Sequence, residues 1–323
     1  MRLRVTLTNA QDTLSEGRLP IIARGHNLGC CRAAWLDIGP SASYDSAMVR
    51  PAVRYPAVAG QFYPARAAAL TRELDAFLAP SARQEPDLPD AVGCLVPHAG
   101  YMYSGHVAGA VYRRIPPRRV YVVLGPNHFG NGAPLAEMSE GTWQTPLGEV
   151  ELSPALARVV REACPALTED LVAHAGEHSL EVQIPFLQRR SGAFTLLPIA
   201  VGVGDYETLE MLGHAVARGV KGSADVALIV ASSDMNHYEP DDVTRVIDRK
   251  AIDRMLDLDA MGLYETVIRE RISMCGFGPA VAMLVAAHDL GATRAELIKY
   301  ATSADAGGPR DRVVGYAGII VSR

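Results

Sequence analysis

The chain of 323 residues lacks the features of several protein classes. It has only five cysteines, an odd number scattered along the sequence, which argues against a disulfide framework and predicts a reduced, cytoplasmic protein. No apolar run approaches the roughly 18 residues that a membrane helix needs, and no apolar core of a signal peptide follows the first residues. The net charge of -5 comes without a basic block, so neither nucleic acid nor a membrane is expected as a partner.

Several common motifs are also missing. No Walker loop and no Gly-x-Gly-x-x-Gly turn follows a predicted strand, which excludes the usual phosphate-binding loops. Ser232 and Ser233 lack the Gly-x-Ser-x-Gly elbow of an acyl-transfer nucleophile. The sequence has no internal repeat, so it does not predict a repeat architecture.

The N-terminal residues 1–47 differ from the rest of the chain. Neither helical nor strand periodicity persists there, and the segment ends in a serine-rich run. His26, Cys30 and Cys31 lack a second ligand pair, which makes them a weak metal signal. The sequence therefore predicts a disordered extension over 1–47 and a single domain over 48–323.

Apolar runs and amphipathic segments alternate through this domain. Strands are expected at 92–97, 120–125, 194–201, 226–230 and 313–321, helices at 65–78, 107–115, 180–190, 206–220, 240–258 and 280–288, and an antiparallel excursion at 142–152. Several of the strand runs are apolar throughout, which is typical of strands buried on both faces. The alternation predicts an α/β fold with a largely parallel or mixed central sheet flanked by helices.

Polar side chains follow three of the predicted buried strands at the point where each strand ends. His98 follows the first strand, His128 the second, and Asp234 and His237 the strand at 226–230. Open α/β sheets bind ligands at the carboxyl ends of their strands, and neutral imidazole is the commonest metal ligand. A single histidine in such a place is usually structural, but three strand ends with the same pattern favour a functional site.

Asp234 has three alternative roles on sequence alone. As a third metal ligand it would complete the two-histidine, one-carboxylate set of non-haem Fe(II) oxygenases. As a partner of His237, three residues away, it would orient that imidazole for general acid–base catalysis. As a cap of the turn that follows it, Asp234 would be structural.

Cys275 is a further candidate ligand, because it directly precedes a predicted helix whose N-terminal dipole favours the thiolate. The alternative is that it is a small buried apolar residue. Glu177 and His178 open another helix and are candidates for the same cleft. His174, His214 and His288 lack companions and are expected to lie on the surface or in the core as structural residues.

Five separated motifs carry a resemblance to a known family. They are PHAGY (97–101), GPNHFG (125–130), EHSLEVQIPFL (177–187), SSDMNHY (232–238) and MCGFGP (274–279), joined by RYPAVAGQFYP (54–64). Over residues 51–323 the chain closely resembles the Memo-like family, which is called AmmeMemoRadiSam system protein B in prokaryotes.

The resemblance implies a fold similar to that of class III extradiol dioxygenases. It further implies that His98 and His128 are metal ligands, that Cys275 takes the place of the carboxylate ligand, and that His237 is the catalytic base with Asp234 beside it. Fe(II) is the favoured metal, with Cu and Zn as alternatives that a His-His-thiolate set also suits. A radical SAM protein and an AMMECR-type protein are the implied pathway partners.

Three functions follow from these observations as hypotheses. The first is a metal-dependent oxidoreductase, similar to a dioxygenase, that acts on an unidentified substrate. The second is an adaptor that kept the cleft and binds a small molecule or a peptide without catalysis, because thiolate in place of carboxylate is easily oxidised. The third is Zn-dependent hydrolysis by a metal-bound water.

Overall fold

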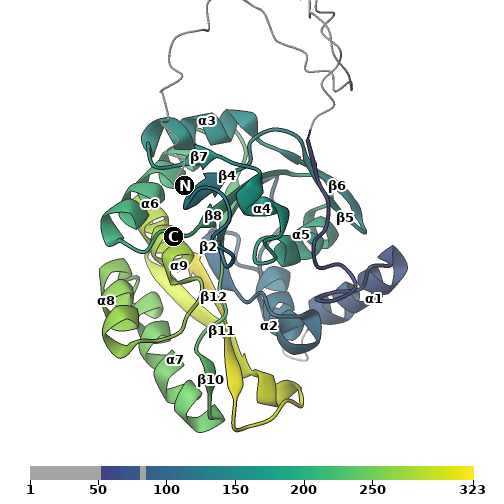
Figure 1. Ribbon diagram of the computed structural model, residues 1–323, viewed down its shortest axis with the longest axis vertical. Helices are drawn as coiled ribbons and strands as arrows, with labels where there is room; N and C mark the ends of the chain where they lie inside the picture. Colours follow the sequence, from purple (N-terminus) through teal and green to yellow (C-terminus); the bar gives the residue numbers. More distant parts are fainter. Residues whose placement is uncertain (1–51, 81–84) are drawn as a thin grey trace, which may run out of the picture. The chain divides into compact units, whose positions relative to one another are not determined.

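A mixed sheet runs through the middle of the protein, with helices on both of its faces (Figure 1). The computed structural model describes residues 52–80 and 85–323, all of which belong to one compact unit. The extension predicted over residues 1–47 lies outside the described residues, and the domain boundary at residue 48 stays a prediction.

The strands are β1 Val53–Arg54, β2 Ala91–Val96, β3 Val120–Pro126, β4 Leu135–Glu137, β5 Thr142–Thr145, β6 Gly148–Leu152, β7 Thr168–Glu169, β8 Thr195–Val201, β9 Ala227–Ser232, β10 His237–Glu239, β11 Arg294–Thr302 and β12 Val313–Ser322. The helices are α1 Ala67–Leu78, α2 Tyr101–Arg114, α3 Pro154–Ala163, α4 Val172–Ala175, α5 Ile184–Ser191, α6 Tyr206–Lys221, α7 Asp241–Leu256, α8 Ala260–Glu270 and α9 Phe277–Asp289, with short 3-10 helices η1 Glu181–Gln183 and η2 Ser303–Ala306. The predicted α/β fold is confirmed.

The strand order β1-β5-β6-β8-β3-β9-β2-β12-β10 places the parallel strands at the centre. Strands β6, β8, β3, β9 and β2 run parallel to one another, whereas β12 pairs antiparallel with β2 and β11. Strands β5 and β6 form the expected antiparallel excursion. Because β3, β9 and β2 are parallel neighbours, their carboxyl ends meet at one edge of the sheet, where His98, His128 and Asp234 follow.

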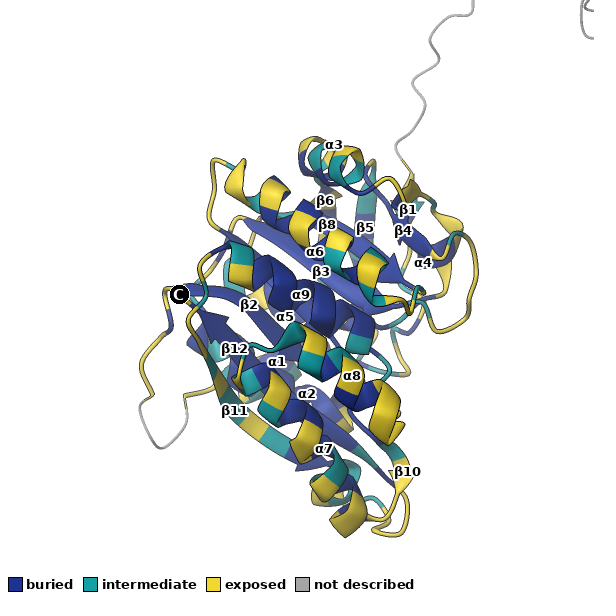
Figure 2. Ribbon diagram, turned by 90° about the vertical axis from the view of Figure 1, so that its left-hand side faces the viewer, coloured by how far each residue is buried: buried dark blue, intermediate teal, exposed yellow. Residues whose placement is uncertain are grey.

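Every residue of β2, β3 and β9 is buried because helices cover both faces of the sheet. Figure 2 shows α9 as an almost completely buried helix, and its run of small apolar residues contributes to one of the two large apolar clusters. The other large cluster contains residues of α1, α2 and α5. Among the described residues, no helix combines the length and the apolar character that a membrane span requires.

Helix α2 begins at Tyr101, six residues before the predicted start at residue 107. The first N–H groups of a helix need partners from outside the helix. The Tyr101 N–H donates to the carbonyl of Phe62 at 2.7 Å, and the N–H groups of His98 and Ala99 just before it donate to Asp234. These partners come from distant parts of the chain, so local sequence spacing did not indicate the earlier start.

Candidate metal centre

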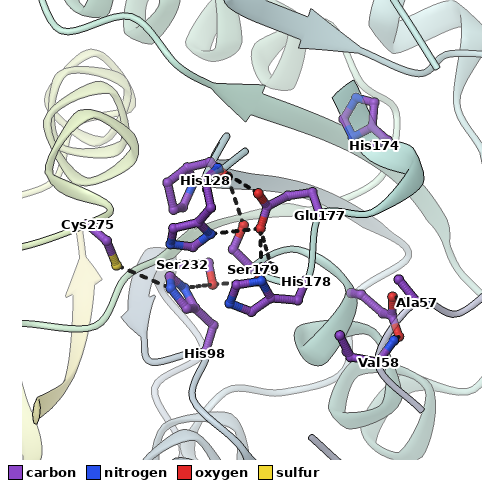
Figure 3. Close-up of polar contacts among 12 residues, drawn as sticks. Ala57, Val58, His98, His128, His174, Glu177, His178, Ser179, Ser232 and Cys275 are labelled. Atoms are coloured by element: carbon purple, nitrogen blue, oxygen red, sulfur yellow. Dashed lines mark hydrogen bonds and ion pairs between the residues drawn. The ribbon is translucent and has the colours of Figure 1, made fainter. Parts of the chain in front are cut away.

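Three histidines converge at the carboxyl edge of the sheet. One ring nitrogen each of His98, His128 and His178 lies within 4.8 Å of the corresponding atom of the other two. The ring centroids are 5.1 Å apart for His98 and His128, 5.5 Å for His98 and His178, and 4.6 Å for His128 and His178. His98 and His128 follow β2 and β3, and His178 comes from the loop between α4 and η1 (Figure 3).

A buried hydrogen-bond network fixes the tautomer of His98. The single hydroxyl proton of Ser232 is donated to the Ser179 carbonyl at 2.7 Å, and the Ser232 oxygen accepts from Gln183 Nε2 at 2.8 Å. The Nδ1–H group of His98 therefore donates a hydrogen bond of 3.0 Å to Ser232 Oγ. This leaves the lone pair of His98 on Nε2. Burial, together with His128, holds the pKa of His98 well below its usual range, so the ring is neutral.

Glu177 fixes His128 in the same way. Its carboxylate accepts from the His128 backbone N–H at 2.7 Å and from His128 Nδ1–H at 2.9 Å, and it also accepts from the Ser179 N–H at 2.8 Å. Burial opposes the charged form, but the hydrogen bonds and charge of His128 outweigh it and hold the pKa of Glu177 at about 2. A carboxylate behind the imidazole leaves Nε2 of His128 free for a ligand.

His178 is the third member of the group and lies beside both Glu177 and His128. Its Nδ1 is 3.5 Å from the Glu177 carboxylate, and its ring is stacked on that of His128 with an interplanar angle of 12°. Burial lowers the pKa of His178, which favours the neutral, metal-binding form of the imidazole.

Cys275 lies against His98, at the start of α9 as the sequence predicts. Its sulfur is 3.2 Å from His98 Nε2, the atom that carries the lone pair, so the thiol donates to the imidazole. Burial, followed by the charge of Asp234, raises the pKa of the Cys275 thiol. Within the part of the chain that the structure describes, Cys275 does not belong to the three-histidine group. Its role as a metal ligand stays a prediction.

Asp234 holds the backbone that carries His98. Its Oδ1 accepts from the N–H groups of His98 and Ala99 at 2.8 and 3.3 Å. No hydrogen bond joins Asp234 to His237 among the described residues. Burial raises the pKa of Asp234 to about 6, against the lowering effect of the His98 N–H. Of the three roles, the geometry supports capping most directly. Asp234 caps the backbone of His98 and Ala99, just before α2, and not the turn that follows Asp234 in the sequence.

His237 is half-buried beside this group at the start of β10. Its Nδ1–H donates to the Ser273 carbonyl at 2.8 Å, and its backbone N–H donates to the Ser273 hydroxyl at 2.8 Å. Both contacts orient the ring and leave Nε2 of His237 with a free lone pair. The assignment of His237 as a catalytic base stays a prediction.

The three imidazoles fit a metal ion. Metal–nitrogen bonds of about 2.1 Å place the nitrogens of one ion roughly 3 to 3.5 Å apart, so the observed separations need only a small closing movement. The Nδ1–H groups of His98 and His128 each donate a hydrogen bond to a protein acceptor, which is the usual arrangement for histidines that bind a metal through Nε2. The nitrogen set suits Fe, Cu, Zn and Ni and does not select one of them.

The sequence did not single out His178 as a ligand or Glu177 as the partner of His128. The available signal is the pair Glu177-His178 directly before a predicted helix, which made both residues candidates for the same cleft without a role for either. Gln183 carried no signal, because its contacts reach Pro97 and Ser232, which are distant in sequence. The expected structural role of His174 agrees with its position, since it is fully buried and stands apart from the cluster (Figure 3).

Comparison with known proteins identifies the family. The family model described as Memo-like protein matches residues 54–320. A MEMO1 family protein of Methanosarcina mazei is 44% identical over 271 residues, which is 83% of this chain and 99% of the relative. MEMO1 family proteins of Pyrobaculum aerophilum and Methanopyrus kandleri are both 42% identical, over 279 and 285 residues, with 84% of this chain and 99% of each relative covered.

The resemblance found in the sequence motifs is thus confirmed over most of the chain, and the α/β sheet with helices on both faces is the fold expected from it. Because the match spans the strands that carry His98, His128 and Asp234 as well as the loop that carries His178, the chain belongs to the Memo-like family.

Proposed function

We propose that the chain binds one metal ion at the three-histidine cluster and acts as a non-haem-metal oxidoreductase. The convergence of three ring nitrogens within 4.8 Å supports this proposal most strongly. Fe(II) is the favoured metal, and Cu or Zn are the alternatives that imidazole and thiolate ligands also suit.

His98 and His128 are the proposed ligands with the best-defined orientation. His178 and Cys275 are the two candidates for a further ligand position, since both lie beside His98. The Cys275 thiol must lose its proton to coordinate, and a bound cation deprotonates a coordinating thiol. Two ligand sets are therefore possible at this site, one of two histidines and a cysteine and one of three histidines. They differ in whether Cys275 or His178 moves toward the ion.

A bound metal of this kind supplies Lewis-acid and redox chemistry. The protein residues hold and move protons around it. His237 has its Nδ1–H committed to the Ser273 carbonyl, so its Nε2 is the atom that takes a proton from a ligand bound at the metal centre. Asp234 keeps the His98 backbone in place and, in this proposal, acts on the chemistry through that residue.

A binding function without catalysis is the second candidate. Phe129 is 59% exposed with its ring 6.5 Å from that of His178, and Tyr238 is 64% exposed with its ring 5.6 Å from that of His237. Exposed aromatic side chains beside a polar cluster favour recognition of a small molecule or a peptide. Under either function, we propose a cytoplasmic protein with a radical SAM protein and an AMMECR-type protein as pathway partners.

Metal binding is tested first, on anaerobically purified protein loaded with Fe(II). The variants are His98→Ala, His128→Ala, His178→Ala and Cys275→Ser, with His214→Ala as the control because His214 is an exposed histidine paired with Asp289. We expect one metal per chain in the wild type and the control, and a loss of affinity of roughly 10-fold or more in His98→Ala, in His128→Ala and in whichever of the other two variants removes a ligand.

The pattern of losses assigns the ligands. A loss in His178→Ala but not in Cys275→Ser indicates the three-histidine set, and the reverse indicates the His-His-Cys set. Absence of metal in the wild type contradicts the proposal, and so does a metal affinity that is unchanged in all four variants. Zinc as the bound metal, with activity unaffected by removal of oxygen, favours hydrolysis. Turnover that His237→Ala abolishes without loss of metal distinguishes an enzyme from a binding protein.

A further inference from the structure

A buried ion pair lies behind the histidine cluster. Arg54 and Glu181 are 5% and 0% exposed, and Arg54 Nη1 pairs with Glu181 Oε2. The guanidinium also lies over the Trp143 ring at 4.5 Å from its centroid. Arg54 opens the motif at 54–64 that forms part of the family resemblance, and nothing in the proposed reaction uses it.

Arg54 binds the backbone of the loop that carries His178 of the cluster and Glu177, the partner of His128. Its Nε donates to the His174 carbonyl at 3.1 Å, and its Nη2 donates to the Glu177 carbonyl at 2.6 Å. The second of these carbonyls belongs to the peptide that joins Glu177 to His178. Because a guanidinium is a planar, rigid fork, these two bonds fix the position of the loop on either side of Gly176.

Glu181 ties the same loop to the segment 53–63. Its carboxylate accepts from the N–H groups of Ala57 and Val58 at 2.7 and 3.1 Å and from the Tyr63 hydroxyl at 2.6 Å (Figure 3 shows Ala57 and Val58 on the side away from Cys275). The ring of Phe62, in this segment, is 4.8 Å from that of His178. The segment therefore packs directly against one of the cluster imidazoles.

The loop itself has little regular structure to hold it. Between α4, which ends at Ala175, and η1, which begins at Glu181, no helix or strand is formed. A ligand has to be kept within about 0.5 Å of its working position. In this loop that precision has to come from side-chain contacts. Ser179 and Glu177 anchor its middle to Pro126, Ser232 and His128, and the contacts of Arg54 and Glu181 hold its two ends.

We infer that Arg54 and Glu181 are positioning residues of the metal centre, which hold Glu177 and His178 in place and join the segment 53–63 to the site. This inference rests on the proposed metal-binding function. Its experiment has one arm that needs no metal, so that a failure of the inference and a failure of the proposed function can be told apart.

Arg54→Lys is the main variant, because lysine keeps the charge opposite Glu181 but cannot bind two carbonyls as a fork. Tyr63→Phe is the milder variant, which removes one of the hydrogen bonds to Glu181. Arg118→Lys is the matched control, since Arg118 is also buried and donates to two carbonyls, Pro89 and Ala91, at the amino end of β2. Both arms use the full chain.

The first arm measures amide hydrogen exchange of residues 174–181 in the metal-free protein. The second titrates Co(II), as a probe with a visible spectrum, and records affinity and the ligand-field bands. We expect faster exchange in this loop and a 10- to 100-fold weaker Co(II) affinity, approximately, for Arg54→Lys, with smaller changes of the same kind for Tyr63→Phe. Arg118→Lys is expected to match the wild type in both arms.

Three results overturn the inference. Exchange at the wild-type rate in both variants shows that the loop does not depend on these contacts. Faster exchange with unchanged Co(II) affinity and spectrum shows a structural role only. Equal effects in Arg118→Lys show a general loss of stability. If the wild type binds no metal, the proposed function fails, and unchanged exchange in Arg54→Lys and Tyr63→Phe then refutes the positioning role as well.

Discussion

His174 makes the protein sensitive to acid in a way that can be calculated from its surroundings. The side chain is fully buried, and neither ring nitrogen has a hydrogen-bond partner among the described residues. Burial, followed by the charge of Arg54, lowers the pKa of His174 to about 4 from its ordinary value of 6.5. Between these two pH values the unfolded chain binds a proton at this position and the folded protein does not.

The sign follows from this difference in bound protons. The free energy of unfolding rises with pH wherever the unfolded state binds more protons, so His174 destabilises the fold as pH falls from 6.5 to 4. Because the pKa of His174 falls from 6.5 to about 4, and each factor of ten in the proton-binding constant is worth about 1.36 kcal/mol, the free energy of unfolding falls by roughly 3 kcal/mol. Below pH 4 both states bind the proton, and the loss from this residue stays constant.

The variant His174→Leu removes this titration and keeps an apolar side chain next to Trp143, whose ring centroid is 5.6 Å from that of His174. Urea unfolding of wild type and variant is compared from pH 7 to pH 4. Carboxyl groups titrate in both proteins, so the informative quantity is the difference between the two curves. We expect the variant to gain about 3 kcal/mol on the wild type over this range.

At pH 7 we expect the variant to be at least as stable as the wild type, because it no longer buries unpaired ring nitrogens. The exposed His214, changed to leucine, is the control for the loss of a histidine outside the core. A wild-type-minus-variant difference that is constant from pH 7 to pH 4 refutes the reasoning, since it means that His174 takes up its proton without unfolding the protein.

Three further predictions concern the surroundings of the site. Glu177→Gln takes the carboxylate away from His128 and is expected to weaken metal binding about 10- to 100-fold in an Fe(II) titration. Burial raises the pKa of Asp248 to about 7, so the wild type loses stability as pH rises from 4 to 7. Asp248→Asn is expected to flatten this part of the stability curve. A variant whose stability follows the same slope contradicts this assignment. Gly276→Ala puts a Cβ 2.3 Å from the Ser232 carbonyl oxygen and is expected to lower the free energy of unfolding by about 1 to 3 kcal/mol in thermal unfolding. Metal binding is expected to weaken as well if the adjacent Cys275 is a ligand. An unchanged melting temperature rules out the clash.

The strands and helices that carry the site were largely predictable because their sequences are periodic or continuously apolar. Every strand predicted in the described residues is present, and the polar residues that follow β2, β3 and β9 do meet at one edge. The sequence did not indicate the short strands β1, β4, β7 and β10, and the longest strand that it missed is β11, Arg294–Thr302. Among the described strands β11 pairs with β12 alone, and its outward positions are exposed, so it carries charged residues such as Glu296 and Lys299 in place of an apolar run.

The roles of individual side chains were less predictable than their neighbourhood. Spacing left Asp234 open as a ligand, a partner of His237 or a cap, and only the hydrogen bonds to the His98 and Ala99 N–H groups favour the cap. The same holds for His178, which stands 50 residues from His128 in the sequence and yet has its ring stacked on it. Its position depends on how the loop after α4 folds back onto the sheet edge.

By itself the sequence determined the α/β class, the carboxyl edge of the sheet as the place of the site, and the family. The class follows from local periodicity, the edge follows from the polar residues at the ends of the apolar runs, and the family follows from the five separated motifs. The tertiary structure alone decided which histidine joins His98 and His128, which nitrogen of His98 carries the lone pair, and how Arg54 reaches the loop of Glu177. Those facts depend on hydrogen bonds between residues that are far apart in the chain, and no local pattern encodes such partners.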